Sequence, residues 1–216
     1  DNEIDMTRKP SRIEKFEKHY KAADAAGVAA PAVLAAADEP NRVIRSFAFL
    51  DLCGFTRFTD RFGPVASKEV LVAFRGVVRD VTERRGVRIA KWMGDGALIV
   101  GVDTPTLVSA AVDIVSRIHT DSLDVRGGVS TGPVLFIDGD DYVGRALNLA
   151  SRLCDMAGPG QVLSDGDSCN DLPNWITTKP YRSVSLKGLG KREDIMSLEA
   201  EPSMRAPIVA LPIQPS

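Results

Sequence analysis

The feature that most limits the possible folds is the order of apolar runs and amphipathic patterns that begins at Arg45. The apolar run SFAFLDL is followed by a helical pattern over residues 64–85. Two more apolar runs, VRIAKWM and ALIVGV, flank a Gly-Asp-Gly turn that is typical of a hairpin. A second helical pattern covers residues 106–119, and the run DVRGGVSTGPVLFI comes after it. The order β-α-β-β-α-β predicts an α+β sandwich of ferredoxin-like type, with helices packed on a central, mostly antiparallel sheet.

The remaining patterns divide the chain into three parts. Residues 144–157 are helical in pattern, and QVLSD, YRSVSLKGL and DIMSLEA complete the expected strands. Residues 1–44 predict a small N-terminal helical extension, because SRIE is a capping-box pattern followed by apolar residues at helical spacing. We therefore expect an extension (1–44), a folded domain (45–200) and a Pro-rich tail (201–216).

Composition and charge exclude several classes of function. The 216 residues carry 27 Lys and Arg against 29 Asp and Glu, so we expect no nucleic-acid surface, which would show a basic excess. The longest apolar runs fall short of the ~18 residues of a membrane span, so no membrane segment is expected in this chain. Three cysteines without a CxxC pair and two distant histidines favour a cytoplasmic setting over a disulfide framework or a zinc site. A longer native protein tethered to a membrane stays open.

Two aspartates stand where expected strands end. Asp51 closes the run FAFLDL, and Gly54 soon after it permits close approach of backbone to a phosphate. Asp95 occupies the tip of the expected hairpin. A turn or capping role explains either aspartate taken alone. If the first strand and the hairpin are neighbours, both carboxylates meet at one end of the sheet and can hold two Mg²⁺ ions ~3.5–4 Å apart.

Further polar residues lie in mostly apolar surroundings. Strand alternation places Lys91 on the same face as Asp95, where a buried hydrogen-bonding role and an ordinary solvated role are equally open. Asn148 and Arg152 are four residues apart and project from one face of an expected helix. The plain alternative is that Asn148 is solvated and Arg152 pairs with Asp155.

Together these residues lie in stretches that closely resemble the class III nucleotidyl cyclase family. The stretches are FAFLDLCGFT, KWMGDG and DYVGRALNLASR, in the right order and with suitable strands and helices between them. A fourth stretch, VSLKGL, is similar to that family's late strand with a phosphate-contacting lysine. The resemblance covers residues 45–200 and implies a cyclase catalytic domain there.

The resemblance implies roles at the matching positions. It implies two divalent metal ions, Mg²⁺ or Mn²⁺, at Asp51, Leu52 and Asp95, and the phosphates of the substrate at Gly54, Phe55, Thr56 and Lys187. It implies that the base is read by Lys91 and Asp141, that Asn148 orients the ribose, and that Arg152 stabilises the transferring α-phosphate.

The implied base-reading pair indicates ATP as the substrate. Adenine offers an acceptor at N1 and a donor amino group at N6, and these match the Lys91 donor and the Asp141 acceptor. Guanine would leave mismatched polar groups against the same pair. The resemblance therefore implies an adenylate cyclase that forms 3′,5′-cyclic AMP and pyrophosphate.

The same resemblance implies a homodimer with shared active sites. The metal aspartates of one chain would face the base-reading, ribose and transition-state residues of the other, and one chain holds both sets. Two alternatives remain: a guanylate cyclase, which Lys91 and Asp141 disfavour, and a catalytically inactive nucleotide-binding or dimerisation module. Trp92 is bulkier than the residue expected beside Lys91, so its face of the sheet must accommodate it.

Overall fold

The computed structural model describes residues 42–118, 123–137, 141–186, 190–192 and 194–202. The expected N-terminal helices, the tail from residue 203 onward and Lys187 lie outside these residues. No helix of the described part is long and apolar enough to cross a membrane. All three cysteines are described and are free thiols.

The secondary structure follows the expected order from the first strand onward. The elements are β1 (Arg42–Cys53), α2 (Phe55–Arg85), β2 (Arg88–Met93), β3 (Gly96–Gly101), α3 (Thr104–Arg117), β4 (Asp124–Ile137), β5 (Asp141–Val143), α4 (Arg145–Met156), β6 (Val162–Asp165), a 3-10 turn (Gly166–Cys169), β7 (Ile176–Pro180), β8 (Val184–Leu186), β9 (Gly190–Arg192) and β10 (Ile195–Ala200).

The strands form an eight-stranded sheet in the order β2-β3-β1-β4-β6-β10-β7, with β5 paired to β4. Every pair is antiparallel except β4 with β6, which is parallel. The first four strands lie in the order β2-β3-β1-β4, which confirms the ferredoxin-like α+β sandwich. Two details differ from the expectation: β8 pairs with β9 in a separate two-stranded sheet, and β7 was not expected as a strand.

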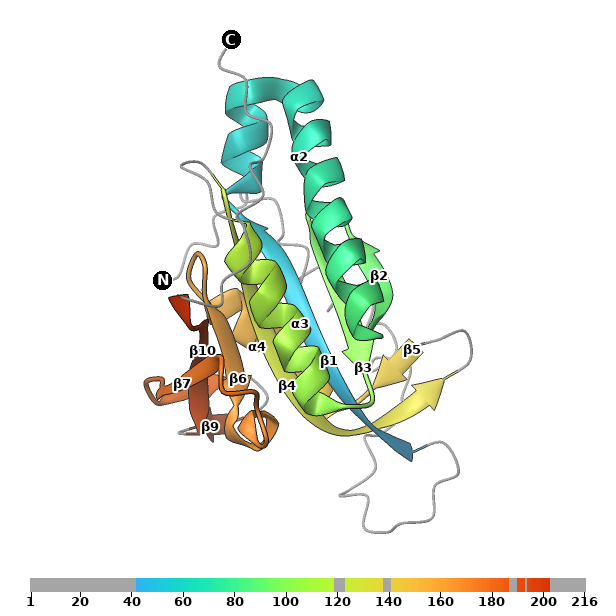
Figure 1. The fold of residues 1–216 in the computed structure, drawn as a ribbon, viewed down its shortest axis with the longest axis vertical. Coiled ribbons are helices and arrows are strands. Elements are labelled where there is room, and N and C mark those ends of the chain that lie inside the picture. Colours follow the sequence, from blue (N-terminus) through green and yellow to red (C-terminus); the bar gives the residue numbers. More distant parts are fainter. Residues whose placement is uncertain (1–41, 119–122, 138–140, 187–189, 193, 203–216) are drawn as a thin grey trace, which may run out of the picture. The chain divides into compact units, whose positions relative to one another are not determined.

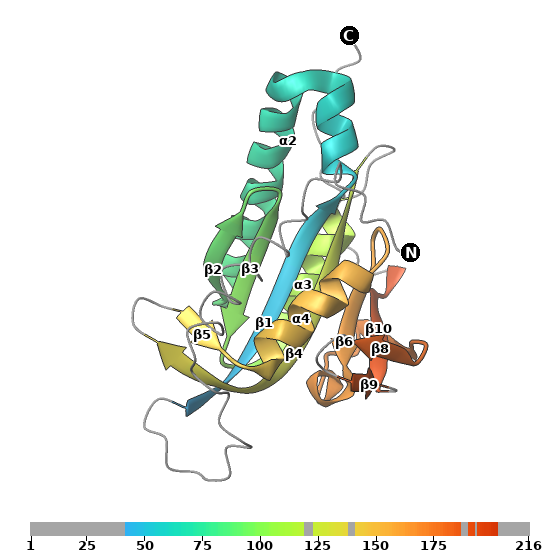
Figure 2. The same ribbon diagram turned by 180° about the vertical axis from the view of Figure 1, so that it is seen from behind.

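Helices cover both faces of the sheet. Figure 1 shows α2 and α3 over one face, and Figure 2 shows α4 over the other. Side chains alternate along β1 to serve both layers. Ala48 and Leu50 belong to the core under α2 and α3, whereas Phe47 and Phe49 pack with α4.

Helix α2 begins earlier than the sequence pattern predicts. Gly54 adopts a left-handed conformation (φ 79°) at its N-cap, and the backbone breaks at Gly63 (φ 78°) just before Pro64. The short first segment is held by Phe58, which is buried and stacks against Phe62 with 4.7 Å between ring centroids. The expected start at Pro64 is therefore the start of the second segment only.

Helix α4 lies directly on the backbone of β4. A Cβ atom at Gly128 would lie only 2.0 Å from the Cys154 amide nitrogen and 2.2 Å from the Ala150 carbonyl oxygen. Only glycine allows this approach, because both contacts are to backbone atoms that cannot move aside alone. The close packing fixes α4, and the residues that it carries, against the centre of the sheet.

Candidate active site

One row of residues crosses four strands at the end of the sheet where β1 ends. Met93 of β2 is opposite Gly96 of β3, Gly96 is opposite Asp51 of β1, and Asp51 is opposite Arg126 of β4. Directly opposed residues of antiparallel strands project to the same face, so these side chains share the α4 face of the sheet. The row places a carboxylate and a guanidinium side by side.

Asp51 and Arg126 form a half-buried ion pair. Asp51 Oδ2 accepts hydrogen bonds from Arg126 Nη2 (2.8 Å) and Nε (3.1 Å). Burial opposes the charge on Arg126, but its hydrogen bond and its attraction to Asp51 outweigh that effect and raise the pKa of Arg126. Arg126 Nη1 also donates to the Asp155 carbonyl oxygen of α4 (2.9 Å). The guanidinium therefore ties the end of β1 to the end of α4.

The hairpin that carries Asp95 lies beside Asp51. The Leu52 amide donates to the Asp95 carbonyl oxygen (3.2 Å). A Cβ atom at Gly96 would lie 3.5 Å from Asp51 Oδ1 and 2.7 Å from the Leu50 carbonyl oxygen. Gly96 therefore leaves room next to the carboxylate of Asp51. The expectation that the first strand and the hairpin are neighbours is confirmed.

The start of α2 adjoins the same end of β1. Gly54 caps the helix without a side-chain hydrogen bond, and the first turn contains no acidic residue. The amide groups of Phe55 and Thr56 stand in that first turn, where helix N–H groups have no partner within the helix. A helix start of this kind attracts anions.

Arg75 of α2 holds the hairpin from the opposite face. Its Nη2 donates to the Gly94 carbonyl oxygen (3.3 Å), and its guanidinium carbon lies 5.1 Å from the centroid of the Trp92 ring. Arg79 lies over the same ring at 5.3 Å. Trp92 thus packs under α2 on the face away from Lys91, which is how the sheet accommodates its bulk.

The two expected base-reading residues lie on strands β2 and β5. Lys91 and Asp141 are both exposed in the single chain. Lys91 is opposite Leu98, so it faces the α4 side of the sheet together with Met93. Asp95 follows β2 in the turn, so strand alternation holds for Lys91 and Met93 but does not extend to Asp95.

Helix α4 carries Asn148 on an exposed position and Arg152 on a half-buried one. Asp155 lies one turn after Arg152 and is half-buried. Burial raises the pKa of Asp155 to about 6, although the positive charges of Arg126 and Arg152 lower it. The charges of Asp51, Arg126, Arg152 and Asp155 therefore interact at the end of α4.

Three residues of this arrangement were not predicted from the sequence: Arg126, Asp155 and Arg75. Arg126 is the third residue of the expected strand DVRGGVSTGPVLFI, and a charge inside an apolar strand was the available signal. The sequence suggests Asp155 only as a partner of Arg152. Arg75 sits within an amphipathic helix, where the sequence gives no sign that it reaches the hairpin.

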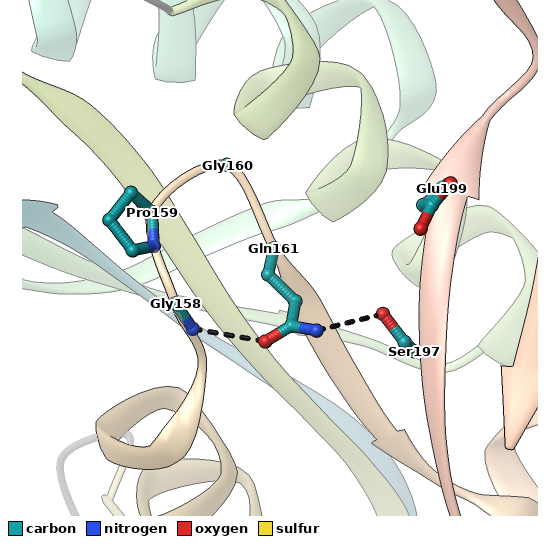
Figure 3. A pocket seen from close by; sticks show the side chains of 6 residues that line it. All are labelled: Gly158, Pro159, Gly160, Gln161, Ser197 and Glu199. Carbon is teal, nitrogen blue, oxygen red and sulfur yellow. Dashed lines mark hydrogen bonds between the residues drawn. The ribbon is translucent and has the colours of Figure 1, made fainter. Parts of the chain in front are cut away.

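Two surface pockets of the described chain lie away from the predicted site residues. One, of about 370 Å³, lies next to Gln161, whose side chain accepts from the Gly158 amide and donates to Ser197 Oγ, both at 3.0 Å (Figure 3). The other, of about 300 Å³, lies between the end of α2 and β2. Neither pocket is lined by a predicted site residue.

No family model matches the chain. An uncharacterized protein of Mycobacterium tuberculosis is 34% identical over 171 residues, which are 78% of this chain and 44% of that protein. An adenylate cyclase of Streptomyces coelicolor is 35% identical over 144 residues, 65% of this chain and 38% of that protein. The chain thus spans less than half the length of these curated relatives.

Solved structures show the same fold. The catalytic core of a rhodopsin-guanylyl cyclase with converted specificity, in complex with ATPalphaS, superimposes with a TM-score of 0.66 at 24% identity, covering 73% of this chain and 96% of that one. The adenylyl cyclase CyaB from P. aeruginosa superimposes with a TM-score of 0.63 at 22% identity, covering 73% and 94%. The chain therefore has the fold of the class III nucleotidyl cyclase catalytic domains, and curated proteins named adenylate cyclase are among its relatives.

Proposed function

We propose that the chain is an adenylate cyclase domain that converts ATP to 3′,5′-cyclic AMP and pyrophosphate. The observation that carries this proposal is the meeting of Asp51 with the Asp95 hairpin beside the start of α2, where the N-cap Gly54 makes no side-chain hydrogen bond. Relatives named adenylate cyclase support the activity. Guanylyl cyclases among the structural neighbours make GTP the second candidate substrate.

The donor atoms at this end of the sheet suit a hard divalent cation. Asp51 and Asp95 offer carboxylate oxygens, and Leu52 offers only its backbone carbonyl oxygen because its buried side chain is a hydrocarbon. The described residues contain no cluster of three or more His, Cys, Asp or Glu able to hold a metal. A pair of carboxylates is nevertheless enough for Mg²⁺ or Mn²⁺, since Mg²⁺ commonly binds one or two carboxylates plus the phosphates of a substrate. When bound, such ions would lower the pKa of the ribose 3′-hydroxyl and neutralise phosphate charge.

The phosphates would lie at the start of α2. The amides at Gly54, Phe55 and Thr56 can donate to phosphate oxygens, and the helix dipole favours negative charge there. Lys187 would contact the distal phosphates, a role that stays a prediction because this residue lies outside the described part.

The reaction would be an in-line displacement at the α-phosphorus. The 3′-oxygen forms the new bond to phosphorus, the bond to the bridging oxygen of the β-phosphate breaks, pyrophosphate leaves, and the hydroxyl proton passes to solvent. Asn148 would orient the ribose. Arg152 would stabilise the charge on the equatorial oxygens, an interaction typically worth a factor of about 10²–10³ in rate.

Lys91 and Asp141 would select adenine by the donor and acceptor match described above. An amino group and a carboxylate that face guanine would leave buried polar groups unsatisfied, which disfavours GTP. The exposure of both residues in the single chain suits a site that closes only when a second copy packs on it.

We further propose that two chains form a C2 homodimer with two shared sites. Asp51 and Asp95 of one copy would meet Lys91, Asp141, Asn148 and Arg152 of the other. The inactive-module alternative requires the loss of a site residue, and all the predicted positions are present.

A turnover assay tests the proposal. The chain would be assayed with ATP and with GTP, in Mg²⁺ and in Mn²⁺, over a range of protein concentrations. We expect cyclic AMP as the main product, with specific activity that rises with concentration as dimers form, and no product from Asp95→Ala. Cyclic GMP as the main product would favour the second candidate. No product from either nucleotide, with dimers present, would favour an inactive module.

A further inference from the structure

Strands β2 and β5 are joined by side chains rather than by backbone pairing. Arg88 of β2 donates from Nη2 to the hydroxyl of Tyr142 in β5 (3.1 Å), and its guanidinium carbon lies 5.9 Å from the centroid of the Tyr142 ring. In the sheet, β5 pairs with β4, and the strands β3, β1 and β4 lie between β2 and β5. This contact therefore helps to determine the spacing between two strands that the backbone leaves unpaired.

The position of Tyr142 is set by the core. The residue is 9% exposed, and its ring packs edge-on against Phe47 and at a tilt against Phe136, each with 5.3 Å between centroids. Such aromatic contacts hold the ring in one orientation. The Tyr142 hydroxyl is thus a fixed point to which Arg88 attaches β2.

A β-bulge in β2 brings Lys91 to the face of this contact. Arg88 is opposite Val100 and Lys91 is opposite Leu98, with the register shifting between Ile89 and Lys91. Because Val100 and Leu98 are two residues apart, Arg88 and Lys91 project to the same face. In a regular strand, residues three apart project to opposite faces, so the bulge re-aims Lys91.

The two strands carry the two residues assigned to the base. Lys91 is three residues after Arg88 in β2, and Asp141 is next to Tyr142 in β5. We propose that Arg88 and Tyr142 are positioning residues for substrate selection: their contact fixes the spacing of Lys91 and Asp141 to match the N1 and 6-amino groups of adenine. This inference rests on the proposed reading of adenine by Lys91 and Asp141.

The physical reason is the geometry that hydrogen bonds require. Lys91 and Asp141 must reach two groups at a fixed separation on one rigid base, and hydrogen bonds weaken steeply when distance or angle departs from the optimum. Without the Arg88–Tyr142 contact, β2 shifts relative to β5 and both hydrogen bonds to adenine weaken. The metal ligands and Arg152 lie on other elements, so the chemical step is affected much less.

The experiment uses Tyr142→Phe, Arg88→Met and Arg88→Lys in the whole chain, with kcat and KM measured for ATP and for GTP. Tyr142→Phe removes only the hydroxyl and keeps the buried ring. We expect the ratio of kcat/KM for ATP to that for GTP to fall about tenfold in Tyr142→Phe and in Arg88→Met, mainly through a higher KM for ATP. Arg88→Lys keeps a donor and should recover part of the ratio.

A matched pair at the opposite edge of the sheet serves as control. Arg182 lies over the Tyr181 ring at 5.6 Å, just after β7. Tyr181→Phe and Arg182→Lys should leave the ratio unchanged. If kcat/KM falls equally for ATP and for GTP in Tyr142→Phe and Arg88→Met, the contact has a merely structural role and the inference is overturned. It is also overturned if neither substitution changes kcat/KM for either nucleotide.

Lys91→Glu separates this inference from the proposed function. If Lys91→Glu leaves the ATP to GTP ratio unchanged, the base is read elsewhere and the proposed function fails in that respect. If Lys91→Glu changes the ratio while Tyr142→Phe and Arg88→Met do not, only the positioning role is wrong. Circular dichroism and melting temperature would verify that each variant is folded. If Tyr142→Phe does not fold, Arg88→Met still tests the inference, because Arg88 is exposed.

Discussion

Asp51 and Arg126 lie directly opposite each other on β1 and β4, with 2.8 Å between Oδ2 and Nη2. The same guanidinium binds the Asp155 carbonyl oxygen at the end of α4. The carboxylate expected to bind metal is therefore also a structural partner of the sheet and of α4. Removal of Asp51 would change both the metal site and the packing around Arg126.

This pairing predicts that the two aspartates assigned to metal, Asp51 and Asp95, differ in their effect on stability. Asp51→Ala should lower the free energy of unfolding more than Asp95→Ala, because it leaves the half-buried Arg126 without its counter-charge. A double-mutant cycle with Arg126→Met, measured by urea unfolding without metal, should give a coupling energy of about 1 kcal/mol. Additive effects would mean that the ion pair contributes nothing to stability.

Subunit complementation tests the shared site. Asp95→Ala and Arg152→Ala chains should each be inactive, but an equal mixture should recover about a quarter of the wild-type activity, because half of the dimers have one complete site. Asp95→Ala is preferred to Asp51→Ala, since it leaves Arg126 paired. The mixture would be assayed after exchange of subunits, with heterodimers verified by differential tags.

If heterodimers form and stay inactive, the division of the site between chains is wrong. A mixture of Asn148→Ala with Arg152→Ala chains serves as the control. Both changes lie on α4 and would damage the same half-site, so this mixture should not recover activity.

Arg75 should influence metal use through the hairpin. Arg75→Met removes the hydrogen bond to the Gly94 carbonyl oxygen, so the turn that carries Asp95 becomes less well placed. We expect the Mg²⁺ or Mn²⁺ concentration for half-maximal activity to rise about fivefold, with an unchanged ATP to GTP ratio. Arg79→Met is the matched control, because Arg79 also covers Trp92 but is not bonded to the turn in the described structure. If both substitutions raise this metal concentration equally, the packing of the two arginines on the Trp92 ring is responsible, and the hydrogen bond to Gly94 is not.

Asp155 predicts a pH dependence of stability with a definite sign. Burial raises its pKa to about 6 in the folded chain, against about 3.9 when unfolded. Between about pH 4 and pH 6 the folded state keeps a proton that the unfolded state has lost, so stability falls as pH rises through this window and stays lower above it.

Asp155→Asn removes this dependence. At pH 7.5 it should be more stable than the original chain by about 2 kcal/mol, and near pH 4 the two should be alike. Urea unfolding in EDTA at several pH values measures the difference. A difference that stays constant from pH 4 to pH 7.5 would contradict the raised pKa.

Much of the fold was predictable because the patterns are local. The apolar run FAFLDL, the helical spacing of the valines in α2 and the Gly-Asp-Gly turn each limit the backbone within a few residues. Their order was enough to predict the ferredoxin-like sheet. β7 (ITTKP) was missed because it ends in proline and has only Ile176 buried, so it lacks an apolar pattern.

The residues matching the cyclase motifs were also found from the sequence, because each motif is contiguous. The contacts that hold them were not, because they join residues distant in sequence. Arg126 meets Asp51 only through the β1–β4 register, Arg88 reaches Tyr142 only where β5 folds beside β2, and no local pattern marks the register shift before Lys91.

The sequence by itself thus determined which residues match the cyclase motifs and in which elements most of them lie, since contiguous motifs and short-range periodicity encode these properties. The tertiary structure alone decided how those residues are held: the row through Asp51 and Arg126, the bulge that aims Lys91, and the glycine at 128 that lets α4 lie on β4. These features depend on strand register and on close packing between distant segments, which are properties of the assembled chain and not of any local stretch of it.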